Sequence, residues 1–118
     1  GIAPYKKWRP ARSSQPSHLN FATGVDGVRY PREMVRYVAG RGTEFLDLTP
    51  RADDVWLNHC ALRAGFPVQQ VSARSANFPL VPGSQRVRLS RVNLSGGNDV
   101  QIAATYTAED VAKLRAAE

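Results

Sequence analysis

The stretch Thr49–Phe66, "TPRADDVWLNHCALRAGF", decides the fold because it carries the strongest helix signal in the chain. Apolar residues recur through it at the spacing of a helix. Thr49 is typical of an N-cap, Pro50 of the first helical position, and Gly65 of the residue that ends a helix. The stretch therefore predicts a helix that begins near Pro50 and ends before Gly65.

Two adjacent carboxylates, Asp53 and Asp54, lie in the first turn of this predicted helix. Carboxylates there are stabilised by the helix dipole, by roughly 0.3–1 kcal/mol each, which accounts for them without a function. Alternatively, the helix start holds one of them as a general base for an incoming hydroxyl. Neighbouring residues point about 100° apart, so only one would face a given substrate. Trp56 and Cys60, four residues apart, favour the core face.

Composition predicts one globular domain, with 118 residues, 42% hydrophobic and 22% charged. No run approaches the roughly 18 apolar residues of a membrane span. The single cysteine excludes an intrachain disulfide and fits a reducing compartment. We therefore expect a cytoplasmic protein, either free or peripheral to the inner face of the membrane. The net charge of +6, with 13 arginines among 16 cations, favours partners that carry phosphate.

Residues 1–19 read as an irregular basic arm, with three prolines, four cations and no acid. Tyr5 and Trp8 stand among these cations, so the arm fits either base stacking on a nucleic acid or wrapping of its own domain. Residues 20–118 form the second unit. Strands are predicted at 20–31, 67–73 and 85–91, and short helices at 32–40, from residue 99, and after Thr107. This alternation predicts an α/β domain.

Two further motifs have both a structural and a functional interpretation. The G-x-x-G of Gly24 and Gly27 fits a bulged strand, or a backbone that approaches a ligand with Asp26 as an acceptor between the glycines. The "SGGND" motif ends in Asn98 and Asp99, and fits a helix cap or a loop that faces phosphate or sugar.

Three segments in order, "LNFATGVDGVRYP", "PRADDVWLNHCALRAGFPV" and "NLSGGNDVQIA", resemble the C-terminal half of bacterial GT-A-fold glycosyltransferases that make surface polysaccharides. The resemblance implies a partial GT-A-like, Rossmann-like sheet with short helices. It implies that Asp54 deprotonates the acceptor hydroxyl and that Asp53 orients the acceptor. The substrate-binding positions that it implies are Gly24, Asp26, Gly27, Trp56, Asn98 and Asp99.

The chain departs from the family pattern in ways that limit this expectation. Asp26 replaces an expected glycine, and Arg32 stands where a second proline is usual. In the family an Asp-x-Asp motif of the N-terminal half binds a divalent metal, Mn or Mg, on the nucleotide-sugar, and the sequence contains no Asp-x-Asp. We therefore expect a fragment that binds no metal alone and is inactive without the missing N-terminal half. A homo-oligomer is a further candidate partner.

The resemblance implies a nucleotide-sugar donor and a glycan or lipid-linked acceptor as partners. Two alternatives stay open from the sequence. One is a basic module that binds nucleic acid through the arm, and the other is a non-catalytic interaction domain.

Overall fold

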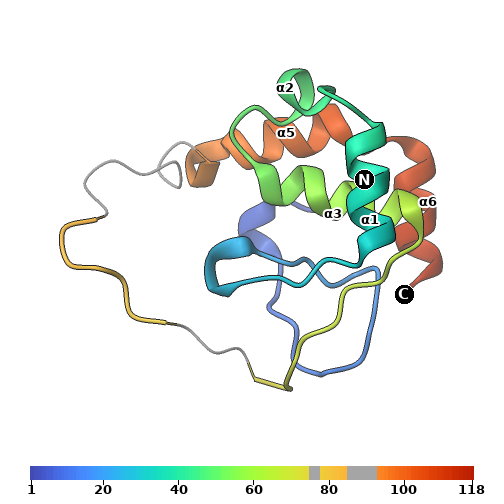
Figure 1. The fold of residues 1–118 in the computed structure, drawn as a ribbon. Helices are drawn as coiled ribbons and strands as arrows, with labels where there is room; N and C mark the ends of the chain where they lie inside the picture. The colour runs from blue at the N-terminus through green and yellow to red at the C-terminus, as the bar shows by residue number, and fades with distance from the viewer. Residues whose placement is uncertain (75–77, 85–92) are drawn as a thin grey trace.

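A computed structural model describes residues 1–74, 78–84 and 93–118 (Figure 1). The elements of these residues are helices and short helical turns, joined by irregular segments. In chain order they are η1 (Tyr5–Lys7), η2 (Gly24–Asp26), α1 (Arg32–Gly40), α2 (Phe45–Leu48), α3 (Asp53–Ala64), η3 (Asn93–Gly97), α5 (Asn98–Thr105) and α6 (Ala108–Ala116).

Helix α3 is the centre of the molecule, with α1, α5 and α6 packed around it (Figure 1). It is buried on nearly all sides, so it lacks the polar face of a surface helix. On one side Trp56 and Cys60 pack with Met34 of α1, and on the other Val55 packs with Ile102 of α5. The two core clusters therefore meet on this one helix.

The predicted end of this helix is confirmed, but its predicted start is wrong. Gly65 has a left-handed φ of 82°, and the N–H of Phe66 returns to the carbonyl of Ala61 at 2.8 Å, as in a Schellman cap. At the other end α3 begins at Asp53, with Ala52 as an N-cap that makes no side-chain capping bond. Pro50 lies instead in the turn that precedes the helix.

The other predicted helices that the structure describes are present. Helix α1 spans the expected residues, with Met34 buried and Val35 exposed. Helix α5 begins at Asn98, inside the "SGGND" motif, with Gly97 as its N-cap and no side-chain capping bond. At α6 the side chain of Thr107 accepts from the backbone of Asp110, whose carboxylate accepts in return, which completes a capping box.

The α/β prediction is wrong, because the part of the chain that the structure describes contains no β-strand and no sheet. Residues 20–31 and 67–73 are irregular apart from η2, and Ser17 and Val68 form an isolated antiparallel bridge. Side-chain amides bind backbone groups that a neighbouring strand would otherwise bind. Asn58 pairs with both the N–H and the carbonyl of Ala22, and Gln69 binds the carbonyl of Ser14. The strand predicted at 85–91 lies outside the described residues.

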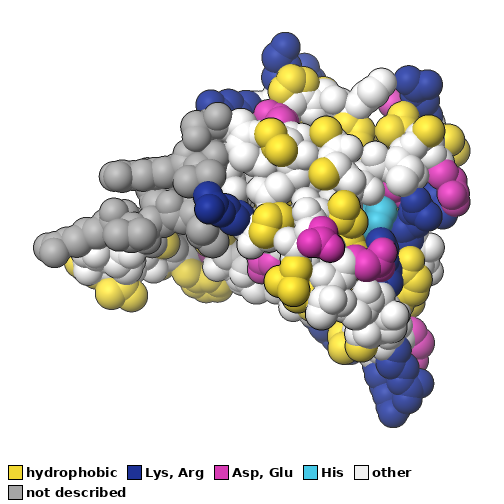
Figure 2. Space-filling model, turned by 90° about the horizontal axis from the view of Figure 1, so that it is seen from above, with side chains coloured by type: hydrophobic (Ala, Val, Ile, Leu, Met, Phe, Trp, Pro, Cys, Tyr) yellow, Lys and Arg dark blue, Asp and Glu magenta, His cyan; other side chains and the backbone are white. Residues whose placement is uncertain are grey.

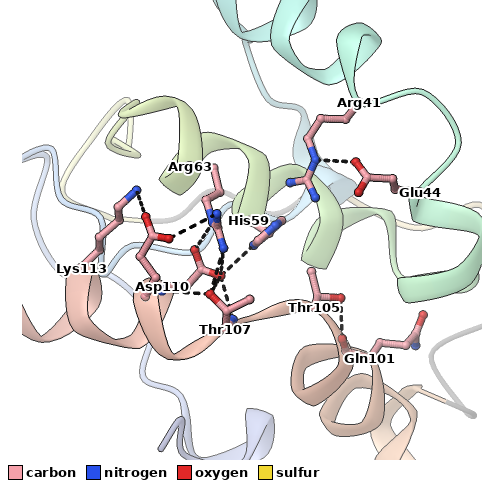
Figure 3. Close-up of polar contacts among 10 residues, drawn as sticks. Arg41, Glu44, His59, Arg63, Gln101, Thr105, Thr107, Asp110 and Lys113 are labelled. Atoms are coloured by element: carbon pink, nitrogen blue, oxygen red, sulfur yellow. Dashed lines mark hydrogen bonds and ion pairs between the residues drawn. The ribbon is translucent and has the colours of Figure 1, made fainter.

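A buried polar cluster fastens α6 to α3 (Figure 3). The carboxylate of Asp110 is fully buried and accepts from the guanidinium of Arg63 and from the backbone N–H of Thr107. Nδ1 of His59 lies 3.5 Å from Oδ2 of the same carboxylate. Burial alone would raise the pKa of Asp110, but these hydrogen bonds and charges leave it below its usual value. The cluster is enclosed, and we assign it a structural role.

Candidate functional site

The carboxylate of Asp54 joins the first turn of α3 to the glycine motif. Its Oδ1 accepts a hydrogen bond from the backbone N–H of Gly24 at 2.9 Å. A Cβ at Gly24 would lie 3.4 Å from this oxygen, in van der Waals contact with it, so a larger side chain there would reach the carboxylate. Two segments that are 30 residues apart in the chain therefore meet at this oxygen.

The local environment makes Asp54 a stronger base than a free aspartate. Burial raises its pKa, and the negative charge of Asp53 raises it further, while the bond from Gly24 acts in the opposite direction. The side chain is half-buried, so one part of the carboxylate is held and another remains accessible. A carboxylate that is held in place, with a raised pKa, is suited to take a proton from a hydroxyl.

Asn58, one turn further along α3, holds this arrangement in place. Its Nδ2 donates to the carbonyl of Asp54 at 2.8 Å and to that of Ala22 at 2.6 Å, while its Oδ1 accepts from the N–H of Ala22 at 2.9 Å. Asn58 was not among the site residues predicted from the sequence. Its spacing of four residues from Asp54 was the available signal, because such residues share a helix face.

Two tyrosines lie within electrostatic reach of the carboxylate. The pKa of Tyr5 is raised by burial and then by the charge of Asp54. That of Tyr30 is raised by burial and then by the charges of Asp54 and Asp53. Tyr5 comes from the N-terminal arm, and nothing in the sequence indicated that it would lie here. The charge of Asp54 therefore acts on both phenol groups.

Asp99, the last residue of the "SGGND" motif, contributes to the site indirectly, through η1. Its Oδ1 accepts from the backbone N–H of Tyr5 at 2.7 Å, so the start of α5 holds η1 in place. Asn98 beside it is buried. Hydrogen bonds thus join Gly24 to Asp54 and Tyr5 to Asp99, and the charge of Asp54 acts on Tyr5.

The remaining predicted site residues are placed differently. Asp53 is exposed beside Asp54, and Gly27 adopts a φ of 100° that favours glycine. The Oδ1 atom of Asp26 accepts a hydrogen bond from the N–H of Phe78 at 3.1 Å. Trp56 is only 4% exposed and packs in the core, where the guanidinium of Arg41 stacks on its ring at 4.3 Å. The structure does not bring Trp56 to the Asp54 site.

The acidic pair does not fit a metal site. Oδ1 of Asp54 is engaged by the N–H of Gly24. Within the described ranges, no group of three or more His, Cys, Asp or Glu side chains is arranged to hold a metal ion. We therefore derive no step through a metal.

The basic arm packs on its own domain. The rings of Tyr5 and Trp8 lie 5.0 Å apart, and that of Phe21 lies 4.9 Å from Trp8, where all three cover the second core cluster. Lys and Arg side chains are spread around the face seen in Figure 2 rather than gathered in one stripe. A cavity of about 430 Å³ lies between the arm, α3 and α6, but Asp54 is not among the residues that line it.

Comparisons of the chain with protein-family models, with curated proteins and with solved structures give no significant match. Among the helices that the structure describes, none combines the length and the apolar character needed to cross a membrane.

Proposed function

We propose that this chain is the acceptor side of a glycosyltransferase, which moves a sugar from a nucleotide-sugar to a hydroxyl of a glycan or a lipid-linked acceptor. In this proposal Asp54 is the general base. It takes the proton of the acceptor hydroxyl as the oxygen attacks the anomeric carbon, and the nucleoside diphosphate leaves with the electron pair of the broken bond. Asp53 and the two tyrosines orient the acceptor.

One observation carries the proposal, the hydrogen bond between Gly24 and Asp54. The resemblance rests on three segments that are well separated in the sequence, and this bond joins two of them. The contact supports the function of those segments and not the sheet that the family would imply. The raised pKa of Asp54 is a second point in support, because a base works best when its pKa approaches the working pH.

Acceptor binding is tested by titrating the ¹⁵N-labelled chain with octyl glycosides that carry galactose, glucose or N-acetylglucosamine. We expect at least one of them to shift the amides of Gly24, Gly27 and Asp54 in a saturable manner. Gly24→Leu should abolish the shifts, because its side chain would fill the space beside Oδ1 of Asp54. Gly40→Leu is the matched control, since nothing lies within 4 Å of a Cβ there. A chain whose site amides respond to none of the glycosides would refute acceptor binding.

The role of the base is tested in a transfer assay with nucleotide-sugar donors, on any preparation of the protein that shows transfer. Asp54→Asn should lower kcat by at least about 100-fold with little change in the KM for the acceptor. Asp47→Asn, an exposed aspartate of α2, is the control and should leave kcat unchanged. Equal kcat values for wild type and Asp54→Asn would remove Asp54 from the chemistry.

A further inference from the structure

An exposed apolar segment lies beside the candidate site. The side chains of Phe78, Leu80 and Val81 are 69%, 61% and 72% exposed, and Val25, in η2, is 74% exposed. The N–H of Phe78 donates to Oδ1 of Asp26, which fixes the start of the segment against the glycine motif. These apolar side chains therefore belong to the same part of the surface as the loop that holds Asp54.

The segment has the shape of a projecting tip. Residues 78–84 extend away from the helices (Figure 1). The backbone N–H of Ser84 donates to the carbonyl of Val81 at 3.1 Å, and Gly83 has a φ of 78°, so Pro82 and Gly83 form a tight turn. The turn presents Leu80 and Val81 to the solvent rather than to the core.

The sequence on either side of this tip is basic, although the carboxylate of Asp26 lies against its first residue. From residue 64 to residue 98 the sequence contains four arginines and no acidic residue. Arg74, which the structure describes, is exposed. Basic residues beside exposed apolar ones suit the surface of an anionic bilayer, where the cations meet lipid phosphates and the apolar groups enter the headgroup boundary. A stable protein interface takes about 20–30 residues on each side, more than this narrow tip offers.

We propose that residues 78–84, together with Val25, form a binding surface for an anionic lipid bilayer. The segment would hold the Asp54 site at the membrane, where a lipid-linked acceptor is presented. That consequence rests on the proposed function, whereas the lipid binding itself does not.

The test is sedimentation of the whole chain with two kinds of vesicle, phosphatidylcholine alone and phosphatidylcholine with about 30% phosphatidylglycerol. We expect binding to the anionic vesicles at least about 10-fold tighter than to the neutral ones, and weaker binding as NaCl rises from about 0.05 to 0.5 M. Leu80→Ser/Val81→Ser should weaken binding at least about 10-fold, and Arg74→Gln several-fold.

Val35→Ser/Leu46→Ser is the matched control, because both residues are comparably exposed but lie on α1 and α2. This variant should bind vesicles like the wild type. All the changed side chains are exposed, and circular dichroism verifies that each variant keeps its helices.

Three outcomes would overturn the proposal: no binding to anionic vesicles, equal binding by Leu80→Ser/Val81→Ser, or equal loss in the control. Self-association without vesicles that Leu80→Ser/Val81→Ser abolishes would assign the tip to a second copy and also overturn it. The glycoside titration is a separate readout. Lipid binding without glycoside shifts would refute the proposed function and leave the membrane surface standing. Glycoside shifts without lipid binding would refute the membrane surface and leave the proposed function standing.

Discussion

Replacement of Asn58 by alanine should loosen the candidate site and destabilise the fold together. The side chain is only 9% exposed and makes three hydrogen bonds, which hold both backbone groups of Ala22 and the carbonyl of Asp54. Alanine makes none of them. The N–H and carbonyl of Ala22 then lose their partners on α3, and the loop that leads to Gly24 is no longer tied to the helix.

The expected cost follows from these bonds. A hydrogen bond inside a protein contributes about 0.5–1.5 kcal/mol net, so three of them contribute about 1.5–4.5 kcal/mol. Ala22 is half-buried, so water satisfies part of the loss. We therefore expect Asn58→Ala to lower the free energy of unfolding by about 2–3 kcal/mol.

Urea denaturation with linear extrapolation measures this cost, and an unchanged m value shows that the compactness of the two states is unaltered. The amide resonance of Gly24 reports the site, because the bond to Asp54 should weaken when the loop is released. Asn20→Ala is the matched control. Its Nδ2 donates to the carbonyls of Gln15 and Val68, so its loss should destabilise the chain without moving the Gly24 resonance.

Asn58→Asp separates geometry from bonding. It keeps the acceptor for the N–H of Ala22 but turns a carboxylate oxygen towards the carbonyls of Ala22 and Asp54, so we expect it to cost at least as much as alanine. A cost below about 1 kcal/mol for Asn58→Ala, or an unmoved Gly24 resonance, would refute the positioning role of Asn58.

Two further predictions concern the fold. Burial, with the charges of Arg41 and Arg63, lowers the pKa of His59 to about 4, although the carboxylate of Asp110 acts in the opposite direction. Between that value and the usual 6.5 the unfolded chain binds more protons, so stability falls as the pH falls. Urea titrations should give about 2 kcal/mol less stability at pH 5 than at pH 7.5. His59→Gln should remove this difference and His18→Gln retain it, and the reverse would contradict the assignment. Gly65→Ala should lower the free energy of unfolding by about 1–2 kcal/mol, because Gly65 has a φ of 82°, although the space around it is open. Gly40 has no positive φ, so the control Gly40→Ala should stabilise the chain slightly. Equal effects of the two substitutions would refute backbone strain as the cause.

The parts of the fold that follow from local chemistry could be predicted from the sequence. The end of α3 at Gly65 and the capping box of Thr107 and Asp110 each depend on a few neighbouring residues, and both are present. The predicted start of α3 was wrong because Thr49 and Pro50 are residue types that suit a helix start, whereas the backbone there forms a separate turn. Local preference does not distinguish a turn that precedes a helix from its first turn.

The sequence alone could not exclude a sheet, because a strand and an irregular segment that is held by side-chain amides have similar patterns of residue types. Asn58 occupies both backbone groups of Ala22, much as a neighbouring strand would. Which backbone group an amide binds is decided by tertiary contacts. Local sequence patterns could not predict the position of Tyr5 for the same reason, because its backbone N–H is held by Asp99, 94 residues away.

The two carboxylates that begin α3 can now be distinguished. The helix dipole acts on both and does not explain why they differ. Asp53 is exposed, whereas Asp54 is half-buried, accepts from a segment 30 residues earlier and has a raised pKa. A residue that only complemented the dipole would gain nothing from this burial, because desolvation destabilises the charged carboxylate. The fold thus keeps a cost at Asp54 that helix electrostatics does not require, and the proposed general-base role is one in which the raised pKa would be useful.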